Sequence, residues 1–236
     1  MSPFLAELIG TTILVLLGNG VVANVSLKKT FGNDSGLIVI ATGWALAVFT
    51  AVACVGHISG AHLNPAVTIG LAAAGKFATD QVLSYIAAQM LGGFLGAVLV
   101  WAFYNDHYKA TADEPNAMLG TFCNTPAISN PPRNLFCEAV GTFILVYAVL
   151  MMTPPKFTTT AGAINVAMIV FVIGLCLGGT TGYAINPARD LSPRIAHAIL
   201  PIAGKRDSNW GYAWIPVIGP ILGGLAAAGL YLLAGE

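Results

Sequence analysis

The chain has few charged residues for its length. Only 8% of its 236 residues are Asp, Glu, Lys or Arg, whereas 56% are hydrophobic, and an ordinary soluble domain has roughly 25% charged residues. So few charges cannot cover the surface of a soluble fold of this size. The net charge is zero, so the sequence also lacks the basic excess that a nucleic acid attracts. The composition therefore indicates a membrane protein with no nucleic-acid partner.

The chain also lacks the cysteine spacing of metal sites and redox pairs. Cys54, Cys137 and Cys176 stand in apolar segments, where a free cysteine packs as a small apolar residue. Cys123 stands alone in a polar stretch. We therefore expect no metal, no cofactor and no disulfide. No nucleophile, base and orienting group occur together at a motif spacing, so we expect no enzyme.

Long hydrophobic segments are abundant instead. Six of them are almost free of charge, and most reach the roughly 20 residues that span a bilayer as a helix. The first is not a cleavable signal peptide, because it has no basic start and contains Glu7. The six predicted spans are approximately residues 3–25, 36–55, 81–104, 135–152, 161–177 and 211–233.

The two halves of the chain repeat each other. The segment from Glu7 to Thr11 matches the segment from Glu138 to Thr142, and a glycine pair matches at the same offset (Gly92-Gly93 and Gly223-Gly224). Each half has three spans, an odd number, so the halves enter the membrane from opposite sides as an inverted repeat. We expect one channel domain over residues 1–236, with repeats at about 1–110 and 134–236 and a linker loop at about 105–133.

Small residues four apart allow two helices to approach closely in lipid. Three such pairs of glycines occur in the predicted spans, and we expect helix crossings at each of them. The pairs are Gly92 with Gly96, Gly174 with Gly178, and Gly219 with Gly223.

An Asn-Pro-Ala tripeptide lies between the second and third spans of each half. Asparagine is a favoured N-cap and proline suits the first turn of a helix, so Asn64-Pro65-Ala66 and Asn186-Pro187-Ala188 each predict a helix start. The apolar segments that follow, 65–74 and 187–200, are too short to span. The stretches before them, 56–63 and 178–185, are then non-helical at membrane depth. Such backbone is tolerated only where it is buried in protein or lines a watery cavity, which predicts a pore.

The two half-helices would direct their positive N-termini at the pore centre and repel cations and protons. Asn64 and Asn186 at the tips would donate to a passing oxygen; the alternative is that they are N-caps alone. Extended backbone has no partners for its carbonyl groups. We therefore expect a row of pore-lining acceptors from the carbonyls of Gly60, Ala61, His62, Leu63, Gly182, Tyr183, Ala184 and Ile185.

The paired Asn-Pro-Ala boxes, with Arg189 after the second, resemble the aquaporin and glycerol-facilitator family over almost the whole chain. The resemblance implies an all-α membrane protein with six transmembrane helices and two re-entrant half-helices in a right-handed bundle around a central pore. It also implies a homotetramer in the lipid of the cell (plasma) membrane, with one pore per subunit and cytoplasmic termini. The positive-inside rule favours the opposite orientation, because that topology leaves only Lys76 and Lys156 in inner loops.

Arg189 is the strongest candidate for a functional side chain. A guanidinium within the membrane is costly and by default functional; the alternative is a structural partner for Asp190 or a carbonyl. In the family the matching arginine belongs to the narrowest constriction, and by position its companions here are Trp44, Gly174 and Tyr183. Gly174 would leave room, and the two aromatic rings would hold an alkyl backbone opposite Arg189.

Four further positions agree with the glycerol-conducting branch of the family: Asp190, Arg194, Pro216 and Val217. The resemblance implies a passive channel for glycerol, water and related small neutral solutes that excludes protons and ions. Tyr183 departs from the family, in which phenylalanine is familiar. Its hydroxyl can donate and accept, so dihydroxyacetone and undissociated small hydroxy acids are further candidate solutes.

Glu7 and Glu138 are carboxylates at equivalent places in the two halves. They are expected, with Asp190, to be structural supports that accept hydrogen bonds from the segments holding the half-helices, a role that the family also assigns. The alternative is that they carry protons in a coupled secondary carrier of small solutes.

Overall fold

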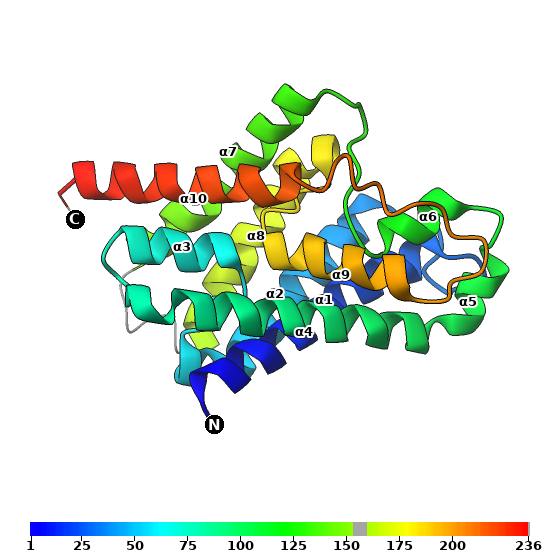
Figure 1. Ribbon diagram of the computed structural model, residues 1–236, viewed down its shortest axis with the longest axis horizontal. Helices are drawn as coiled ribbons and strands as arrows, with labels where there is room; N and C mark the ends of the chain where they lie inside the picture. The colour runs from blue at the N-terminus through cyan, green and yellow to red at the C-terminus, as the bar shows by residue number, and fades with distance from the viewer. Residues whose placement is uncertain (153–159, 236) are drawn as a thin grey trace.

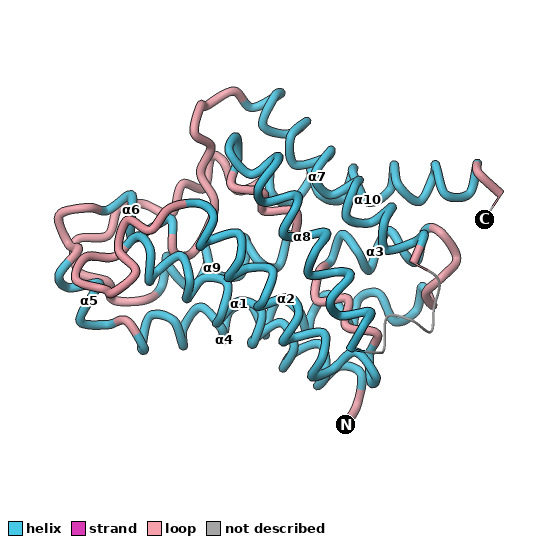
Figure 2. The backbone as a smooth tube through the Cα atoms, turned by 180° about the vertical axis from the view of Figure 1, so that it is seen from behind, coloured by secondary structure: helices cyan, strands magenta, loops and turns pink. Residues whose placement is uncertain are grey.

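The computed structural model describes residues 1–152 and 160–235, which form α-helices, one short 3-10 helix and no strand (Figures 1 and 2). Six of the described helices are long and apolar enough to span a membrane. The predicted spans are therefore confirmed, with ends that differ by a few residues. They are α1 (Pro3–Ser26), α2 (Leu37–Ser59), α4 (Val82–Phe103), α7 (Pro131–Met151), α8 (Thr160–Thr181) and α10 (Ile215–Leu233).

Two shorter helices, α3 (Pro65–Ala73) and α9 (Pro187–Ile199), have the predicted starts and lengths of half-helices. Figure 1 shows them nearly in line, with their N-termini facing each other between α4 and α10. Each packs on the third spanning helix of the opposite half. A Cβ atom on Gly224 of α10 would lie 2.7 Å from the Ala66 carbonyl oxygen of α3, and one on Gly93 of α4 would lie 2.9 Å from the Ala188 carbonyl oxygen of α9. The inverted repeat thus interlocks its two halves.

Glycines set the crossings within each half. A Cβ atom on Gly96 of α4 would lie 2.8 Å from the Thr12 carbonyl oxygen of α1, and one on Gly219 of α10 would lie 3.1 Å from the Leu135 carbonyl oxygen of α7. Two of the three predicted glycine pairs therefore bring helix backbones together. The crossing predicted at the third pair, on α8, is wrong, because those glycines face the ring of Tyr183.

The linker predicted as a loop at 105–133 is partly helical. It contains α5 (Asn105–Ala110), α6 (Pro115–Gly120) and the first turn of α7. Met118, Leu119 and Phe122 are buried against residues of α1 and α4, so tertiary packing stabilises these short helices despite their polar composition. The predicted inner-loop residue Lys156 lies outside the described residues.

The predicted non-helical stretches are also shorter than expected. Helix α2 continues to Ser59 and α8 to Thr181, so only residues 60–64 and 182–186 are non-helical before the half-helices. A glycine follows each helix, and Gly60 ends α2 in the left-handed conformation with a φ of 80°. The sequence marks these ends, because glycine is the usual residue just past a helix C-terminus.

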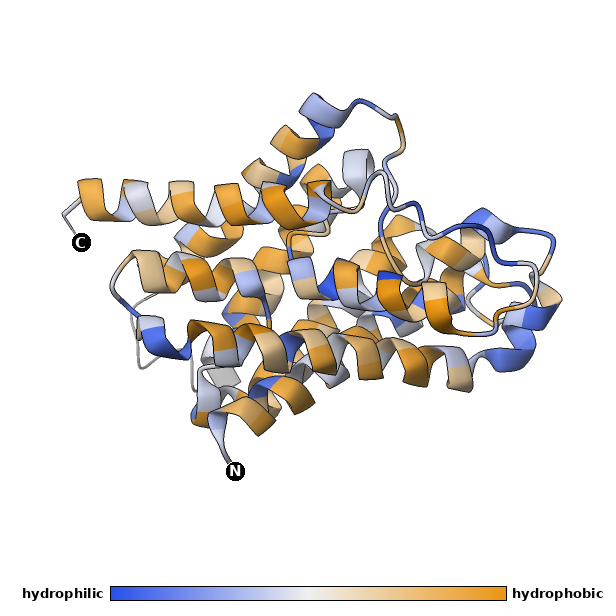
Figure 3. Ribbon diagram, viewed as in Figure 1, coloured by the Kyte–Doolittle hydropathy of each residue, from blue (hydrophilic) through white to orange (hydrophobic). Residues whose placement is uncertain are grey.

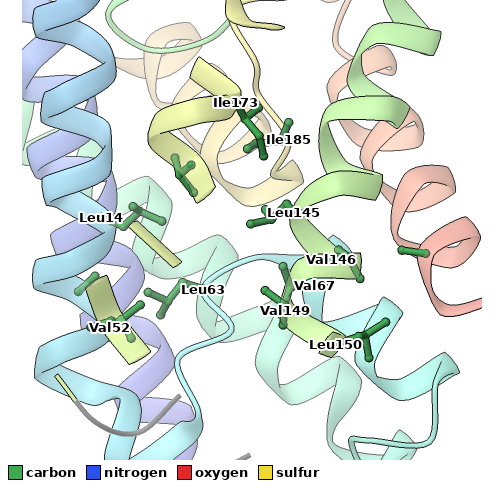
Figure 4. Packing of buried hydrophobic residues seen from close by; sticks show 14 of the residues in the cluster. Leu14, Val52, Leu63, Val67, Leu145, Val146, Val149, Leu150, Ile173 and Ile185 are labelled. Carbon is green, nitrogen blue, oxygen red and sulfur yellow. The ribbon is translucent and has the colours of Figure 1, made fainter. Parts of the chain in front are cut away.

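Apolar residues predominate in the spanning helices, and polar residues gather at α5, next to α6 and at the turn after α3 (Figure 3). The central apolar cluster is formed where the halves meet, with Leu14 and Val52 from the first half and Leu145, Val149 and Ile173 from the second (Figure 4). The predicted fold class is confirmed: an all-α membrane protein with six spanning helices, two re-entrant half-helices and an inverted repeat.

Candidate pore and constriction

The two Asn-Pro-Ala asparagines are N-caps of the half-helices. The Asn64 Oδ1 atom accepts from the Ala66 N–H at 2.9 Å. The Asn186 Oδ1 atom accepts from the N–H groups of Ala188 at 3.0 Å and Arg189 at 3.2 Å. Both asparagines are extended, with a φ of −157°, and the proline after each occupies the first turn. Local sequence chemistry therefore builds the two helix ends alike.

The same two side chains also connect the halves of the molecule. Asn64 Nδ2 donates to the Ile185 carbonyl oxygen at 2.8 Å, and Asn186 Nδ2 donates to the Leu63 carbonyl oxygen at 2.9 Å. An amide nitrogen has two hydrogens, so one of each pair is left for another acceptor. Of the predicted row of acceptor carbonyls, Leu63 and Ile185 thus already have a donor within the protein.

The sequence predicted extended backbone in the segments before the half-helices. These segments instead contain residues in the left-handed region. The φ angles are 47° at Ala61, 52° at Leu63, 42° at Tyr183 and 43° at Ile185. Non-glycine residues of this kind cost about 1–3 kcal/mol each and persist where surrounding contacts hold them. A specific set of contacts must therefore stabilise both segments.

Glu7 supplies those contacts in the first half. Its Oε1 atom accepts from the His62 N–H at 3.0 Å and from the Ser59 hydroxyl at 2.6 Å. Its Oε2 atom accepts from the Leu63 N–H at 2.8 Å and from Gln89 Nε2 at 2.8 Å. The carboxylate is fully buried, and every one of these donors lies on α2, α4 or the segment that precedes α3.

Glu138 makes the equivalent contacts in the second half. Its Oε1 atom accepts from the Ala184 N–H at 3.0 Å, and its Oε2 atom accepts from the Ile185 N–H at 2.8 Å. Each carboxylate thus accepts two backbone N–H groups of its segment. These N–H groups are not available as donors to the carbonyl oxygens of the same segment. Neither Glu7 nor Glu138 lines the cavity.

Asp190 forms a buried network one residue after Arg189. Its Oδ1 atom accepts from Arg194 Nη2 at 2.7 Å and its Oδ2 atom accepts from the Asn124 N–H at 2.7 Å. Arg194 also donates to the carbonyl oxygens of Asn124 at 2.9 Å and Ser208 at 2.7 Å. The network ties two connecting segments to α9. Sequence reasoning did not identify Asn124, since no local pattern marks a loop amide as a partner of α9.

Trp44, Tyr183 and Arg189, which the sequence predicts to form a constriction, all line one cavity. The guanidinium carbon of Arg189 lies 4.3 Å from the centroid of the Trp44 ring, a cation–π contact. Arg189 is only 6% exposed, and its Nη1 atom has no hydrogen-bond partner among the described residues. The Tyr183 hydroxyl has none either. The described contacts do not place Arg189 as the partner of Asp190, which pairs with Arg194 instead.

Gly174 does not contribute open space to this constriction. A Cβ atom there would lie 2.9 Å from Tyr183 Cζ and 3.0 Å from the Tyr183 hydroxyl oxygen. The room predicted at Gly174 is therefore taken by the tyrosine ring, and Gly174 itself does not line the cavity.

A cavity of about 340 Å³ is lined by Trp44, Tyr183 and Arg189, by both Asn-Pro-Ala asparagines and by Lys76 and Phe77 of the turn after α3. Both non-helical segments line it, and most of the other lining residues are aliphatic. Among the lining residues, His62 lies against the rings of Phe77 and Tyr85, at 4.6 and 4.9 Å between centroids. The principal lining residues are Leu14, Trp44, Val48, Val52, Gly60, Ala61, His62, Leu63, Asn64, Lys76, Leu145, Val149, Val170, Tyr183, Ala184, Ile185, Asn186, Arg189 and Tyr231.

Similar proteins share this architecture. A probable glycerol uptake facilitator protein of Thermotoga maritima is 55% identical over 231 residues, 98% of each chain. A D/L-lactic acid transporter of Lactiplantibacillus plantarum is 41% identical over 231 residues, 97% of this chain and 95% of the relative. The X-ray structure of the aquaglyceroporin from Plasmodium falciparum superposes with a TM-score of 0.84 at 30% identity, covering 97% of this chain and 93% of that one. The family model described as major intrinsic protein matches residues 1–231, and the chain therefore belongs to the major intrinsic protein family.

Proposed function

We propose that this chain is a passive channel for glycerol, water and related small neutral solutes, and that it excludes protons and ions. The observation that carries this function is the two-sided lining of one cavity. Residues of both non-helical segments line the cavity, and Leu14, Val48 and Val149 are among its aliphatic lining residues. In this proposal the backbone carbonyls of the two segments form the polar side. A polyol has hydroxyls along one edge and C–H groups along the other, so it matches both surfaces.

Arg189 and Trp44 give the constriction the same two-sided character. A buried Nη1 atom without a partner can donate to a solute hydroxyl, and such an unsatisfied group costs about 1–3 kcal/mol until it finds one. The guanidinium covers one face of the Trp44 ring, and the part of the ring that lines the cavity offers apolar surface to a carbon backbone. A glycerol-sized solute would thus replace its water contacts at the constriction.

Ion and proton exclusion would arise at the half-helix tips. The N-termini of α3 and α9 each carry about half a positive elementary charge, and both point at the cavity centre beside Asn64 and Asn186. Each asparagine has one N–H that is not used between the halves, so a water molecule there would accept from both. A water held as an acceptor cannot pass a proton along the file.

The contacts of Glu7 and Glu138 favour a channel over a proton-coupled carrier. Each carboxylate accepts two backbone N–H groups, Glu7 also accepts from Ser59 and Gln89, and neither residue is part of the cavity lining. A coupled carrier needs a carboxylate that reaches its substrate path in at least one state. The structural role assigned to both residues accounts for all of their described contacts.

Tyr183 extends the range of solutes. Its hydroxyl and the Arg189 guanidinium are two buried polar groups on one constriction, suited to a solute with neighbouring oxygens. Dihydroxyacetone and undissociated small hydroxy acids belong to that class. The lactic acid transporter among the relatives supports this extension, since lactic acid is a hydroxy acid.

The proposed assembly is a homotetramer of single channel domains in the lipid of the cell membrane, with one pore per subunit and cytoplasmic termini. Apolar side chains that face outward on the spanning helices, such as Leu46, Leu95 and Leu225, suit contact with lipid or with other subunits. Mass measurement of the detergent-solubilised protein tests the tetramer. Protease access to tags on the two termini, measured in intact cells, tests the topology.

Light scattering from osmotically challenged proteoliposomes tests the function. Vesicles with the protein should re-swell in glycerol much faster than empty vesicles, without saturation and without dependence on a proton gradient, and should stay shrunken in an impermeant sugar. Glycerol uptake equal to that of empty vesicles at verified protein incorporation would contradict the proposal. Saturable uptake that follows a proton gradient would favour the carrier.

A further inference from the structure

Two buried glycines of α8, Gly174 and Gly178, face the side chain of Tyr183. A Cβ atom on Gly178 would lie 2.5 Å from Tyr183 Cδ1 and 3.0 Å from Cε1, and one on Gly174 would lie 2.9 Å from Cζ. Carbon atoms in favourable contact are about 3.5–4.0 Å apart. The ring therefore occupies a slot in the surface of α8 that exists only because both positions lack a side chain. Gly178 meets the base of the ring and Gly174 meets its tip.

The slot lies on the opposite side of the ring from the pore. Tyr183 lines the cavity, whereas neither glycine does. The ring thus stands between α8 and the passage beside Trp44 and Arg189. A side chain on α8 would push the ring away from the helix, and the space on that side is the constriction.

The first half of the molecule has the reverse arrangement. Counted back from the asparagines, Ala61 stands where Tyr183 stands, and Val52 of α2 stands where Gly174 stands. Both Val52 and Ala61 line the cavity. In the first half the small residue Ala61 is paired with the branched residue Val52 of α2. In the second half the large ring of Tyr183 is paired with Gly174 of α8. Gly56 of α2 stands where Gly178 stands, so a glycine at that position occurs in both halves. The glycine at 174 is particular to the second half, and it accompanies the large ring of Tyr183.

We infer that Gly178, with Gly174, is a specificity-determining position that holds the Tyr183 ring out of the solute path and so sets the width of the constriction. The residue acts through Tyr183 and does not itself touch the solute. This inference rests on the proposed conduction of polyols, and it assigns the size limit of that conduction to a helix residue behind the filter.

The test compares glycerol and water permeability of Gly178→Ala and Gly174→Ala in proteoliposomes, normalised to incorporated protein. One methyl group of misfit at a selective site changes discrimination by roughly tenfold or more, so the glycerol-to-water ratio should fall by roughly tenfold in Gly178→Ala. Gly179→Ala is the matched control, because this neighbouring glycine of the same helix is exposed and has no atom within 4 Å of a built Cβ. Its ratio should equal that of the wild type.

A second substitution shows whether the effect passes through the ring. In a Tyr183→Ala background the ring is absent, so adding Gly178→Ala should leave the ratio unchanged. A similar fall of the ratio in that background would overturn the inference, as would an unchanged ratio in Gly178→Ala alone. If Gly178→Ala and Gly174→Ala do not accumulate as folded protein, Tyr183→Ala should restore their yield, and failure to restore it would also contradict the slot.

A different result would contradict the proposed function. Wild-type vesicles that take up no glycerol would contradict conduction itself, whatever the variants do. In that case water permeability alone still tests the slot, because the displaced ring should reduce it in Gly178→Ala and should not in Gly179→Ala.

Discussion

Asn186, at the tip of the second half-helix, donates through Nδ2 to the carbonyl oxygen of Leu63, the residue before the first half-helix, across 2.9 Å. The equivalent hydrogen bond from the first half-helix runs from Asn64 Nδ2 to the carbonyl oxygen of Ile185. These two bonds join the halves of the repeat at the centre of the cavity. The asparagines thus fix the separation of the tips, in addition to capping the helices and lining the cavity.

Replacing Asn64 with alanine should destabilise the protein by about 1–3.5 kcal/mol. Loss of an N-cap costs about 0.5–2 kcal/mol, and loss of the bond to Ile185 adds about 0.5–1.5 kcal/mol. Thermal unfolding of the detergent-solubilised protein measures the change. Asn116→Ala is the control, because Asn116 is exposed on α6 and contacts Arg206 at the surface. Equal unfolding temperatures for the two variants would contradict the role of Asn64 between the halves.

Glu138→Gln should conduct glycerol but unfold more easily than the wild type. Each carboxylate oxygen now accepts one backbone N–H, from Ala184 or Ile185, and glutamine offers a single acceptor. One N–H is then left unsatisfied at a cost of about 1–3 kcal/mol. Glu138→Ala leaves both without a partner and should lower the folded yield further. Normal yield of Glu138→Gln with abolished transport would instead identify the carboxylate as a proton carrier.

Arg194→Met should be strongly destabilising. Arg194 and Asp190 are both fully buried and joined at 2.7 Å, and removing one partner of a buried pair costs about 3–5 kcal/mol because the other charge stays unpaired. The double variant Arg194→Met with Asp190→Asn should recover part of that loss, since it removes the unpaired charge. Unfolding in denaturant or heat measures both variants. A double variant less stable than Arg194→Met would contradict the pairing.

Arg189→Val should raise the proton leak through the channel while leaving the fold intact. The guanidinium contacts Trp44, and its Nη1 atom has no partner in the part of the chain that the structure describes, so its removal breaks no described hydrogen bond of that atom. A pH-sensitive dye inside proteoliposomes reports the leak under an imposed proton gradient. A leak that stays at the wild-type level would show that the half-helix ends exclude protons by themselves.

Tyr183→Phe should lower the permeability to undissociated small hydroxy acids and dihydroxyacetone relative to glycerol. The hydroxyl has no partner within the described chain, and one net hydrogen bond to a solute is worth about 0.5–1.5 kcal/mol, roughly two- to tenfold. Uptake of the three solutes by wild type and variant, at a pH low enough to keep the acid neutral, measures the ratios. Unchanged ratios would mean that the hydroxyl contacts only α8 beside Gly174.

Much of the architecture was predictable from local sequence. Uncharged segments of about 20 residues mark spans because each backbone polar group in lipid must be satisfied within the helix. Asn-Pro at 64–65 and 186–187 marks helix starts by capping chemistry, and the short apolar segments after them mark half-helices. The segment around Glu7 and its copy around Glu138 predicted the inverted repeat. All of these signals act over a few residues, so a single sequence contains them.

Tertiary structure decided the rest, because the deciding contacts join residues far apart in the chain. The bonds of Asn64 and Asn186 to the opposite half, and the network of Asp190, Arg194 and Asn124, depend on distances that no local pattern fixes. Gly174 and Gly178 illustrate the difference most clearly. Their spacing predicts a helix crossing, yet in the folded chain they receive the ring of Tyr183, since a small-residue surface accepts whichever group the fold brings to it.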